Sequence, residues 1–167
     1  MTATFILGGA RSGKSARAQA LAETAGETRL YIATAEALDE EMVARIARHK
    51  ADRGAGWRTV EAPLDLVAAM EAADAPVVLV DCLTLWLSNL MHHGRNVEAE
   101  TDALCACLGR FGGEVILVSN EVGLGLVPET PLGRAFRDAQ GRLNQRVAAA
   151  CDVVEFVAAG LPLRLKG

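Results

Sequence analysis

The sequence predicts an α/β fold in which helices flank a mostly parallel central sheet. Two observations carry this prediction. Apolar, β-prone runs alternate along the chain with segments of helical periodicity, an order that produces parallel strands joined by crossover helices. A glycine-rich turn also separates the first such run from the first helical segment. The 167 residues contain no repeat, low-complexity tract or linker, so we expect one domain spanning residues 1–167.

The glycine-rich turn, GGARSGKS, matches the phosphate-loop pattern G-x-x-x-x-G-K-[ST] and predicts a nucleotide site. Residues 4–7 before it are apolar and residues 16–23 after it favour a helix, which is the strand–turn–helix context that the pattern needs. Its glycines let several backbone N–H groups face one phosphate, and the helix start adds positive charge. The alternative is a glycine turn with a chance Lys-Ser pair. The predicted nucleotide-binding residues in the turn are Gly8, Gly9, Ala10, Arg11, Ser12, Gly13, Lys14 and Ser15.

The remaining elements follow the same alternation. We expect further strands at residues 29–33, 57–61, 77–81, 114–119, 153–158 and 161–166. We expect helices at residues 39–50, 64–73, 97–108 and 132–150, and a loop followed by a helix within residues 82–90. Carboxylates begin the 39–50 segment and cations end it, which suits the dipole of a helix.

Asp81 ends a run of four apolar residues, which is the form of a Walker B strand. Ligands of open α/β sheets bind at the carboxyl ends of the strands, where Asp81 would lie. Because nucleotide-bound Mg²⁺ requires oxygen ligands, Ser15 and Asp81 together predict a magnesium site. Lys14 would neutralise the β- and γ-phosphates beside it. Asp81 alone could be a turn former, and phosphate binding does not by itself select a reaction.

Charge and cysteine usage argue against several classes of protein. The formal net charge is −4 and no basic stripe is present, so nucleic acid is a poor candidate partner. None of the four cysteines forms a C-x-x-C pair, which favours reduced thiols in a cytoplasmic protein. No apolar run reaches membrane-spanning length, and the first residues lack the pattern of an export signal. We therefore expect a cytoplasmic protein with no membrane span.

Six segments together resemble a known family. They are Gly8–Ser15, 31–34 (YIAT), 45–50 (RIARHK), 57–61 (WRTVE), 120–129 (NEVGLGLVPE) and 141–145 (GRLNQ). In this order they resemble the bifunctional adenosylcobinamide kinase / adenosylcobinamide-phosphate guanylyltransferase family of cobalamin synthesis. The resemblance covers almost the whole chain and is weakest between residues 90 and 112. It implies a P-loop NTPase with a RecA-like fold.

The resemblance implies two reactions on one substrate. A nucleoside triphosphate, ATP or GTP, phosphorylates the aminopropanol hydroxyl of adenosylcobinamide. GTP then donates GMP to that phosphate, which yields adenosylcobinamide-GDP and pyrophosphate. Mg²⁺ is the implied cofactor, and a homotrimer with sites near the subunit boundaries is the implied assembly. The sequence leaves open which nucleotide serves the kinase step.

His49 is the position that matches the family's guanylylated histidine. A neutral imidazole can attack an α-phosphate and leave readily from the phosphoramidate, which divides one hard transfer into two. Nearby cations would offset phosphate charge and favour the neutral imidazole; they are Arg45, Arg48, Lys50 and Arg53. The alternative is a surface histidine at a helix end. His49 must also reach the α-phosphate while Lys14 holds the β/γ end, which requires a helix movement or a site shared between subunits.

Further nucleotide contacts follow from the resemblance. They are Ala33, Thr34, Ala35, Lys50, Ala51, Asp52, Arg53, Glu61 and Asp81. Plain alternatives are a helix cap for Thr34, a solvent-facing carboxylate for Glu61 and a solvated basic turn for residues 50–53. Asn120 and Glu121 could contact the corrinoid or its phosphate, or only structure a glycine-rich turn. Four further positions are expected to be structural: Arg142 and Asn144 on a helix surface, and His92 and His93 in a loop. Trp57 and Trp86 are expected in the core or an interface.

Two rival functions remain at this point. A P-loop small-molecule kinase without nucleotidyl transfer predicts that His49 is dispensable and that no covalent nucleotide forms. A nucleotide-switched interaction module predicts slow hydrolysis, no corrinoid binding and a nucleotide-dependent partner surface.

Overall fold

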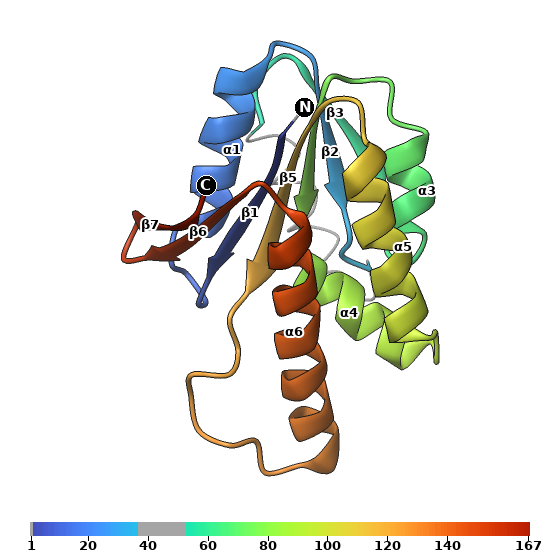
Figure 1. Ribbon diagram of the computed structural model, residues 1–167, viewed down its shortest axis with the longest axis vertical. Helices are drawn as coiled ribbons and strands as arrows, with labels where there is room; N and C mark the ends of the chain where they lie inside the picture. The colour runs from blue at the N-terminus through green and yellow to red at the C-terminus, as the bar shows by residue number, and fades with distance from the viewer. Residues whose placement is uncertain (1, 37–52) are drawn as a thin grey trace.

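Seven strands form one sheet in the order β3-β2-β4-β5-β1-β6-β7 in the computed structural model, which describes residues 2–36 and 53–167 (Figure 1). All neighbouring strands pair in parallel except β7, which runs antiparallel to β6. This confirms the predicted mostly parallel sheet. The strands are β1 (Thr2–Gly8), β2 (Arg29–Ala33), β3 (Trp57–Glu61), β4 (Val77–Asp81), β5 (Glu114–Asn120), β6 (Val153–Ala158) and β7 (Leu161–Lys166).

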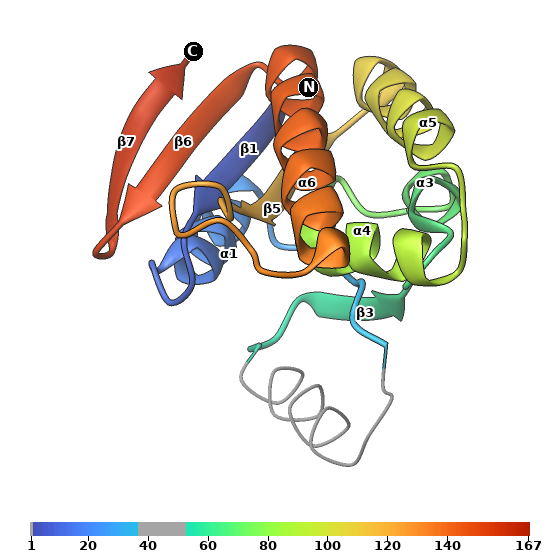
Figure 2. The same cartoon turned by 90° about the horizontal axis from the view of Figure 1, so that it is seen from below.

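Helices cover both faces of the sheet (Figure 2). The helices are α1 (Lys14–Ala25), α3 (Leu66–Glu71), α4 (Leu83–His92), α5 (Val97–Arg110) and α6 (Pro131–Ala150). α1 packs on one face, and the other four pack on the opposite face. The central strands are therefore buried on both sides, which explains why β4 reads as an uninterrupted apolar run.

α1 approaches the sheet through two alanines. Ala18 and Ala22 lie four residues apart, so they share one side of the helix, and both are fully buried. They pack with Ile6 of β1, Leu79 of β4 and Val118 of β5. Because an alanine has no side chain beyond Cβ, the helix can lie close to the strands, and this holds its amino end near the edge where β1 ends.

The structure departs from the sequence-based expectations around α4. The helix begins directly after β4, at Leu83, with no loop of the expected kind. The helix also ends at His92, two residues beyond the expected range. His92, expected in a loop, is therefore the last residue of α4. The Nε2 atom of His93 lies 2.8 Å from a carboxylate oxygen of Glu36. The expected helix at 39–50 lies outside the described residues.

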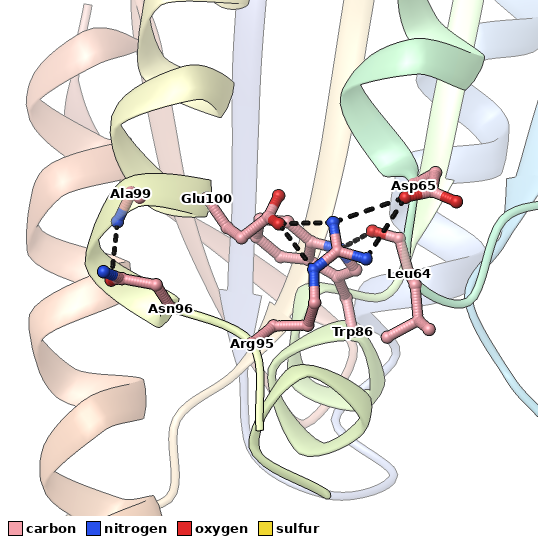
Figure 3. A network of polar contacts seen from close by, with 7 residues as sticks. All are labelled: Leu64, Asp65, Trp86, Arg95, Asn96, Ala99 and Glu100. Carbon is pink, nitrogen blue, oxygen red and sulfur yellow. Dashed lines mark hydrogen bonds and ion pairs between the residues drawn. The ribbon is translucent and has the colours of Figure 1, made fainter. Parts of the chain in front are cut away.

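A polar network joins α3, α4 and α5 (Figure 3). Trp86 is fully buried, as a core tryptophan should be, and its Nε1 atom donates a 2.9 Å hydrogen bond to the Leu64 carbonyl oxygen. The Arg95 guanidinium donates to Glu100 at 2.9 and 2.5 Å and reaches Asp65 at 3.4 Å. Figure 3 shows the guanidinium between the two carboxylates. These contacts hold the three helices together on their shared face of the sheet.

One buried carboxylate ties α1 to the end of the sheet. Glu155 of β6 is almost fully buried and accepts two hydrogen bonds from Arg17, at 2.9 and 3.0 Å. Arg164 of β7 donates a third at 3.1 Å. The Arg17 guanidinium, assisted by Arg164, holds the pKa of Glu155 below its usual range, against the opposing effect of burial. The first turn of α1 is therefore anchored to the β6–β7 hairpin.

We predict that Glu155→Gln lowers the free energy of unfolding at pH 7 by about 2 kcal/mol, because it leaves Arg17 without its buried counter-charge. A carboxylate whose folded pKa is depressed stabilises fully above its unfolded pKa of about 4.3 and loses this effect as the pH falls through the folded value. The difference in the free energy of unfolding between wild type and Glu155→Gln should therefore become smaller in acid. Urea denaturation at pH 7 and pH 3 measures it.

Asp74→Asn is the matched control, because Asp74 pairs with Arg58 while both side chains are exposed. It should change stability by less than about 0.5 kcal/mol. A gap for Glu155→Gln that is equally wide at both pH values would contradict the assignment to this ion pair.

Candidate active site

The glycine-rich turn links β1 to α1 through an unusual backbone. Arg11 and Gly13 adopt positive φ angles of 54° and 94°, and Gly13 is the residue that precedes the helix. No side chain among the described residues caps the amino end of α1. The first N–H groups of the helix are therefore available to an anion.

The β6–β7 hairpin supports this turn. A Cβ atom on Gly8 would lie 2.6 Å from the Val157 carbonyl oxygen, and one on Gly13 would lie 3.1 Å from the Gly160 Cα. The Gly160 N–H also donates a 2.7 Å hydrogen bond to the Ser12 carbonyl oxygen. Real Cβ atoms do not approach backbone as closely as 2.6 Å, so the position of β6 requires glycine at Gly8.

Strand order brings three strand ends together beside the turn. β5 lies between β1 and β4, so Gly8, Asn120 and Asp81 end neighbouring strands on the same edge. Gly8 and Asn120 are partners in register, and the Glu121 N–H donates a 3.0 Å hydrogen bond to the Gly8 carbonyl oxygen. The carboxylate predicted from the apolar run of β4 thus lies on the same edge as the glycine-rich turn.

A cavity of about 490 Å³ lies at this edge. The Lys14 Nζ atom donates a 3.2 Å hydrogen bond to the Gly9 carbonyl oxygen, which holds the ammonium group across the turn. Lys14, Ser15 and Asp81 therefore share one cavity, which brings a cation, a hydroxyl and a carboxylate together. The lining residues are Ala10, Arg11, Lys14, Ser15, Tyr31, Ala33, Ala35, Arg53, Asp81, Cys82, Thr84, Leu85 and Asn120.

Tyr31 and Arg53 form one wall of the cavity. The Arg53 guanidinium carbon lies 3.6 Å from the centre of the Tyr31 ring, and one of its nitrogens donates a 3.2 Å hydrogen bond to Thr59 Oγ1. Burial, assisted by the negative charge of Asp81, raises the pKa of Tyr31 above its usual range, so its phenol stays protonated. The edge of Trp57 packs against Tyr31 with the ring centres 6.2 Å apart. The cavity therefore has a second cation, held by stacking.

Thr34 holds two strand ends together. Its side chain is fully buried, its Oγ1 donates a 2.7 Å hydrogen bond to the Cys82 carbonyl oxygen, and the Cys82 N–H returns one at 2.9 Å. Asn89 Nδ2 donates to the Thr34 carbonyl oxygen at 2.7 Å. The Thr34 hydroxyl thus joins the end of β2 to the β4–α4 junction, and it caps none of the helices that the structure describes.

The structure brings about half of the predicted nucleotide-binding set to the cavity wall. Eight of its residues line the cavity: Ala10, Arg11, Lys14, Ser15, Ala33, Ala35, Arg53 and Asp81. Four residues belong to the glycine-rich turn but do not line the cavity: Gly8, Gly9, Ser12 and Gly13. Glu61 is the last residue of the edge strand β3 and is exposed. His49, Lys50, Ala51 and Asp52 lie outside the described residues.

Sequence reasoning missed a buried polar network behind the cavity. Gln140 Nε2 donates to Ser119 Oγ at 3.0 Å, and Ser119 Oγ donates to Asn144 Oδ1 at 2.8 Å. Asn144 Nδ2 donates to the Asn120 carbonyl oxygen at 3.1 Å. Asn144, expected on a helix surface, is therefore buried and fixes the end of β5. Thr84, also unpredicted, accepts a 2.8 Å hydrogen bond from the Asn120 N–H and lines the cavity.

A larger cavity, of about 620 Å³, lies at the opposite end of β4 and β5. Pro76 and Gly113, which precede those two strands, are among its lining residues. Glu71 and Arg110, which form an exposed ion pair, also line this larger cavity, and no residue of the glycine-rich turn does. We place the active site in the smaller cavity because only there do a glycine-rich turn, a lysine and a strand-end carboxylate converge.

A mostly parallel sheet with this turn and this strand-end aspartate defines a P-loop protein with a RecA-like sheet. Similar solved structures support this class: the flagellar accessory protein FlaH from Methanocaldococcus jannaschii matches with a TM-score of 0.61 at 16% identity, over 99% of this chain and 78% of that one. The RadB recombinase matches with a TM-score of 0.54 at 14% identity, over 93% of this chain and 73% of that one. The predicted fold class is confirmed.

The chain belongs to the cobinamide kinase / cobinamide phosphate guanyltransferase family, whose model matches residues 4–165. It is 52% identical to the bifunctional adenosylcobalamin biosynthesis protein CobP of Pseudomonas aeruginosa, over 98% of this chain and 96% of that protein. It is 42% identical to the bifunctional adenosylcobalamin biosynthesis protein CobU of Salmonella typhimurium, over 97% and 98%. The family resemblance of the six sequence segments is confirmed.

Within residues 2–36 and 53–167, no helix combines the length and the apolar character that crossing a membrane requires.

We predict that Gly8→Ala lowers the free energy of unfolding by about 1–3 kcal/mol, because its methyl group overlaps the Val157 carbonyl. Since the turn must shift to relieve this overlap, we also expect nucleotide affinity to fall about tenfold, or ~1.4 kcal/mol. Chemical denaturation and equilibrium nucleotide binding measure the two effects.

Gly9→Ala is the matched control, since a Cβ there would meet nothing within 4 Å. Its stability should stay within about 0.5 kcal/mol of wild type. Equal stability of the two variants would show that the close approach of β6 does not constrain the turn.

Proposed function

We propose that this cavity serves two consecutive reactions of adenosylcobalamin biosynthesis. In the first, ATP or GTP phosphorylates the aminopropanol hydroxyl of adenosylcobinamide. In the second, GTP transfers GMP to the new phosphate and releases pyrophosphate. Family membership supports both activities. The observation that carries the assignment to this cavity is the convergence of Lys14, Ser15 and Asp81 on its wall.

The glycine-rich turn binds the triphosphate in this proposal. Its backbone N–H groups and the amino end of α1 supply fixed positive partial charge, and Lys14 neutralises the β- and γ-phosphates. Such groups lower the barrier most where charge shifts during the transfer, as it does on the phosphates. Arg53, which is held against Tyr31, is a second cation on the cavity wall and could neutralise another part of the nucleotide.

Mg²⁺ would be held by the Ser15 hydroxyl and the Asp81 carboxylate. Both residues line the cavity and offer the oxygen donors that Mg²⁺ prefers, with nucleotide phosphates completing the set. When bound, Mg²⁺ neutralises phosphate charge. The Ser15 hydroxyl, at the start of α1, and the Asp81 carboxylate, at the end of β4, then orient the triphosphate between the turn and the strand edge.

His49 carries GMP in the second reaction. Its imidazole nitrogen attacks the α-phosphorus of GTP, the bond from that phosphorus to the bridging oxygen breaks, and pyrophosphate leaves with the electron pair. The imidazole keeps its other N–H and becomes cationic, which makes it a good leaving group. A phosphate oxygen of adenosylcobinamide phosphate then attacks the same phosphorus, and neutral His49 is restored.

We also propose that the chain forms a homotrimer, as its family resemblance implies. Sedimentation of the wild-type protein tests this, since a monomer would sediment at one third of the expected mass.

We predict that α-labelled GTP leaves acid-labile, base-stable label on the wild-type protein and none on His49→Ala. The variant should still phosphorylate adenosylcobinamide, because phosphoryl transfer needs the phosphate loop and not the imidazole. Denaturing electrophoresis of labelled protein, with a separate assay of cobinamide phosphate, measures both. His92→Ala and His93→Ala change the two other histidines of the chain and should keep the label. Label retained by His49→Ala would leave the chain as a kinase with another nucleotidyl carrier or none.

We predict that Asp81→Asn raises the Mg²⁺ concentration for half-maximal kinase activity about tenfold, because an amide is a weaker ligand than a carboxylate; this corresponds to ~1.4 kcal/mol of binding free energy. Mg²⁺ titration at saturating nucleotide measures it. Asp74→Asn, at the opposite end of the sheet, should behave as wild type. An unchanged Mg²⁺ dependence in Asp81→Asn would remove Asp81 from the metal site.

A further inference from the structure

The segment between β5 and α6 exposes its apolar side chains. Leu124, Leu126 and Val127 have 83%, 98% and 65% of their surface exposed. Isolated exposed leucines are ordinary, whereas a contiguous exposed apolar patch is typical of an interaction or ligand-binding surface. We call these three side chains the apolar platform. Figure 1 shows the segment extending past the end of β5 to the start of α6, which then runs back toward the sheet.

Hydrogen bonds hold the first end of the segment that carries the platform. The Glu121 N–H donates a 3.0 Å hydrogen bond to the Gly8 carbonyl oxygen, at the start of the phosphate loop. Asn144 of α6 donates to the Asn120 carbonyl oxygen at 3.1 Å. The start of the segment is therefore hydrogen-bonded directly to Gly8, the first residue of the glycine-rich turn.

The second end is fixed as well. Arg134 donates hydrogen bonds of 3.0 and 2.9 Å to the carbonyl oxygens of Pro128 and Glu129. Thr130 caps α6 by accepting a 3.0 Å hydrogen bond from the Gly133 N–H. With both ends held, the apolar residues between them are presented to solvent by a backbone tied to the fold, which is what a docking surface for a large rigid ligand requires.

The segment that carries the platform begins at the cavity wall. Asn120, the residue before the segment, lines the cavity, and so does Leu85 of α4, a large apolar residue with 38% of its surface exposed. An acceptor hydroxyl must come within about 3–3.5 Å of the phosphorus that it attacks. The body of the acceptor must therefore lie within the length of its side arm from this edge.

We propose that Leu124, Leu126 and Val127 bind the corrin macrocycle of the acceptor, an inference that rests on the proposed function. A corrinoid is a large, nearly flat ring with methyl groups on its periphery, and a cavity of about 490 Å³ that must also hold a nucleoside triphosphate cannot enclose it. The ring therefore needs a surface outside the cavity, and apolar contact with its methyl groups is favourable because it removes apolar surface from water. The aminopropanol arm then reaches inward past Asn120.

A second copy of the chain is the other candidate occupant of the platform. Stable protein interfaces bury roughly 800 Å² on each partner, which is far more than three aliphatic side chains supply. The direct link from Glu121 to Gly8 instead couples the platform to the phosphate-binding turn. Both features favour the substrate as the occupant.

The double variant Leu124→Ser/Leu126→Ser tests the proposal. We expect its KM for adenosylcobinamide in the kinase reaction to rise about tenfold at saturating nucleotide. Nucleotide affinity and labelling of the protein by α-labelled GTP without corrinoid should stay at wild-type values, because neither involves the macrocycle. The single variant Leu126→Ser should raise the KM by a smaller factor.

Leu161→Ser/Leu163→Ser is the matched control. These β7 leucines are also exposed, at 72% and 62%, and neither lines the cavity. This variant should keep the wild-type KM for adenosylcobinamide. Sedimentation of every variant shows whether assembly has changed.

An unchanged KM in Leu124→Ser/Leu126→Ser would overturn the proposal. A raised KM that accompanies a loss of assembly and returns to normal at high protein concentration would also overturn it, and would identify the platform as a contact between copies. Failure of the wild-type protein to phosphorylate adenosylcobinamide would instead refute the proposed function, and this is seen before any variant is compared.

Discussion

The phosphate-binding turn depends on the close approach of β6 to β1. Gly8 can end β1 beneath the Val157 carbonyl only because it has no Cβ atom, and the Gly160 N–H fixes the turn through the Ser12 carbonyl oxygen. One helical turn further along α1, Arg17 forms an ion pair with Glu155 and so makes a second connection between α1 and β6. The turn is therefore held by backbone and ion-pair contacts from its far side. The first N–H groups of α1 have no side-chain cap among the described residues and remain available to a ligand.

Strand order then determines what faces the turn. Because β5 lies between β1 and β4, Asp81 lies two strands away from Gly8, and the end of β5 lies between them. Thr34 and Asn144 secure the neighbouring strand ends through buried hydrogen bonds. The proposed metal-binding carboxylate, the glycine-rich turn and the proposed acceptor surface thus lie at one edge of the sheet. This arrangement explains how one cavity could serve a phosphoryl and a nucleotidyl transfer in succession.

Much of this architecture is predictable from local patterns. The limits of β2, β3, β4, β6 and β7 match the expected ranges because apolar, β-prone runs are bounded there by turn residues. The glycine-rich turn and Asp81 are recognisable because their chemistry needs fixed residues at fixed spacing. The buried hydrogen bonds of Thr34 and Asn144 are not predictable in this way, since their partners lie 48 and 25 residues away and no local pattern indicates such pairs. The apolar platform has no periodicity at all, so only exposure reveals it.

The hydrogen bond between Gly160 and Ser12 also affects when the glycine-rich turn can fold during synthesis of the chain. The motif that binds phosphate lies near the start of the chain, whereas Glu155, which anchors its helix, lies 138 residues further on than Arg17. Contacts between such distant residues form late, because a long loop must first close. A nascent polypeptide that has not yet been extended through β6 thus contains the whole glycine-rich turn but lacks the contacts that fix the turn's backbone. We expect such a chain to bind nucleotide poorly.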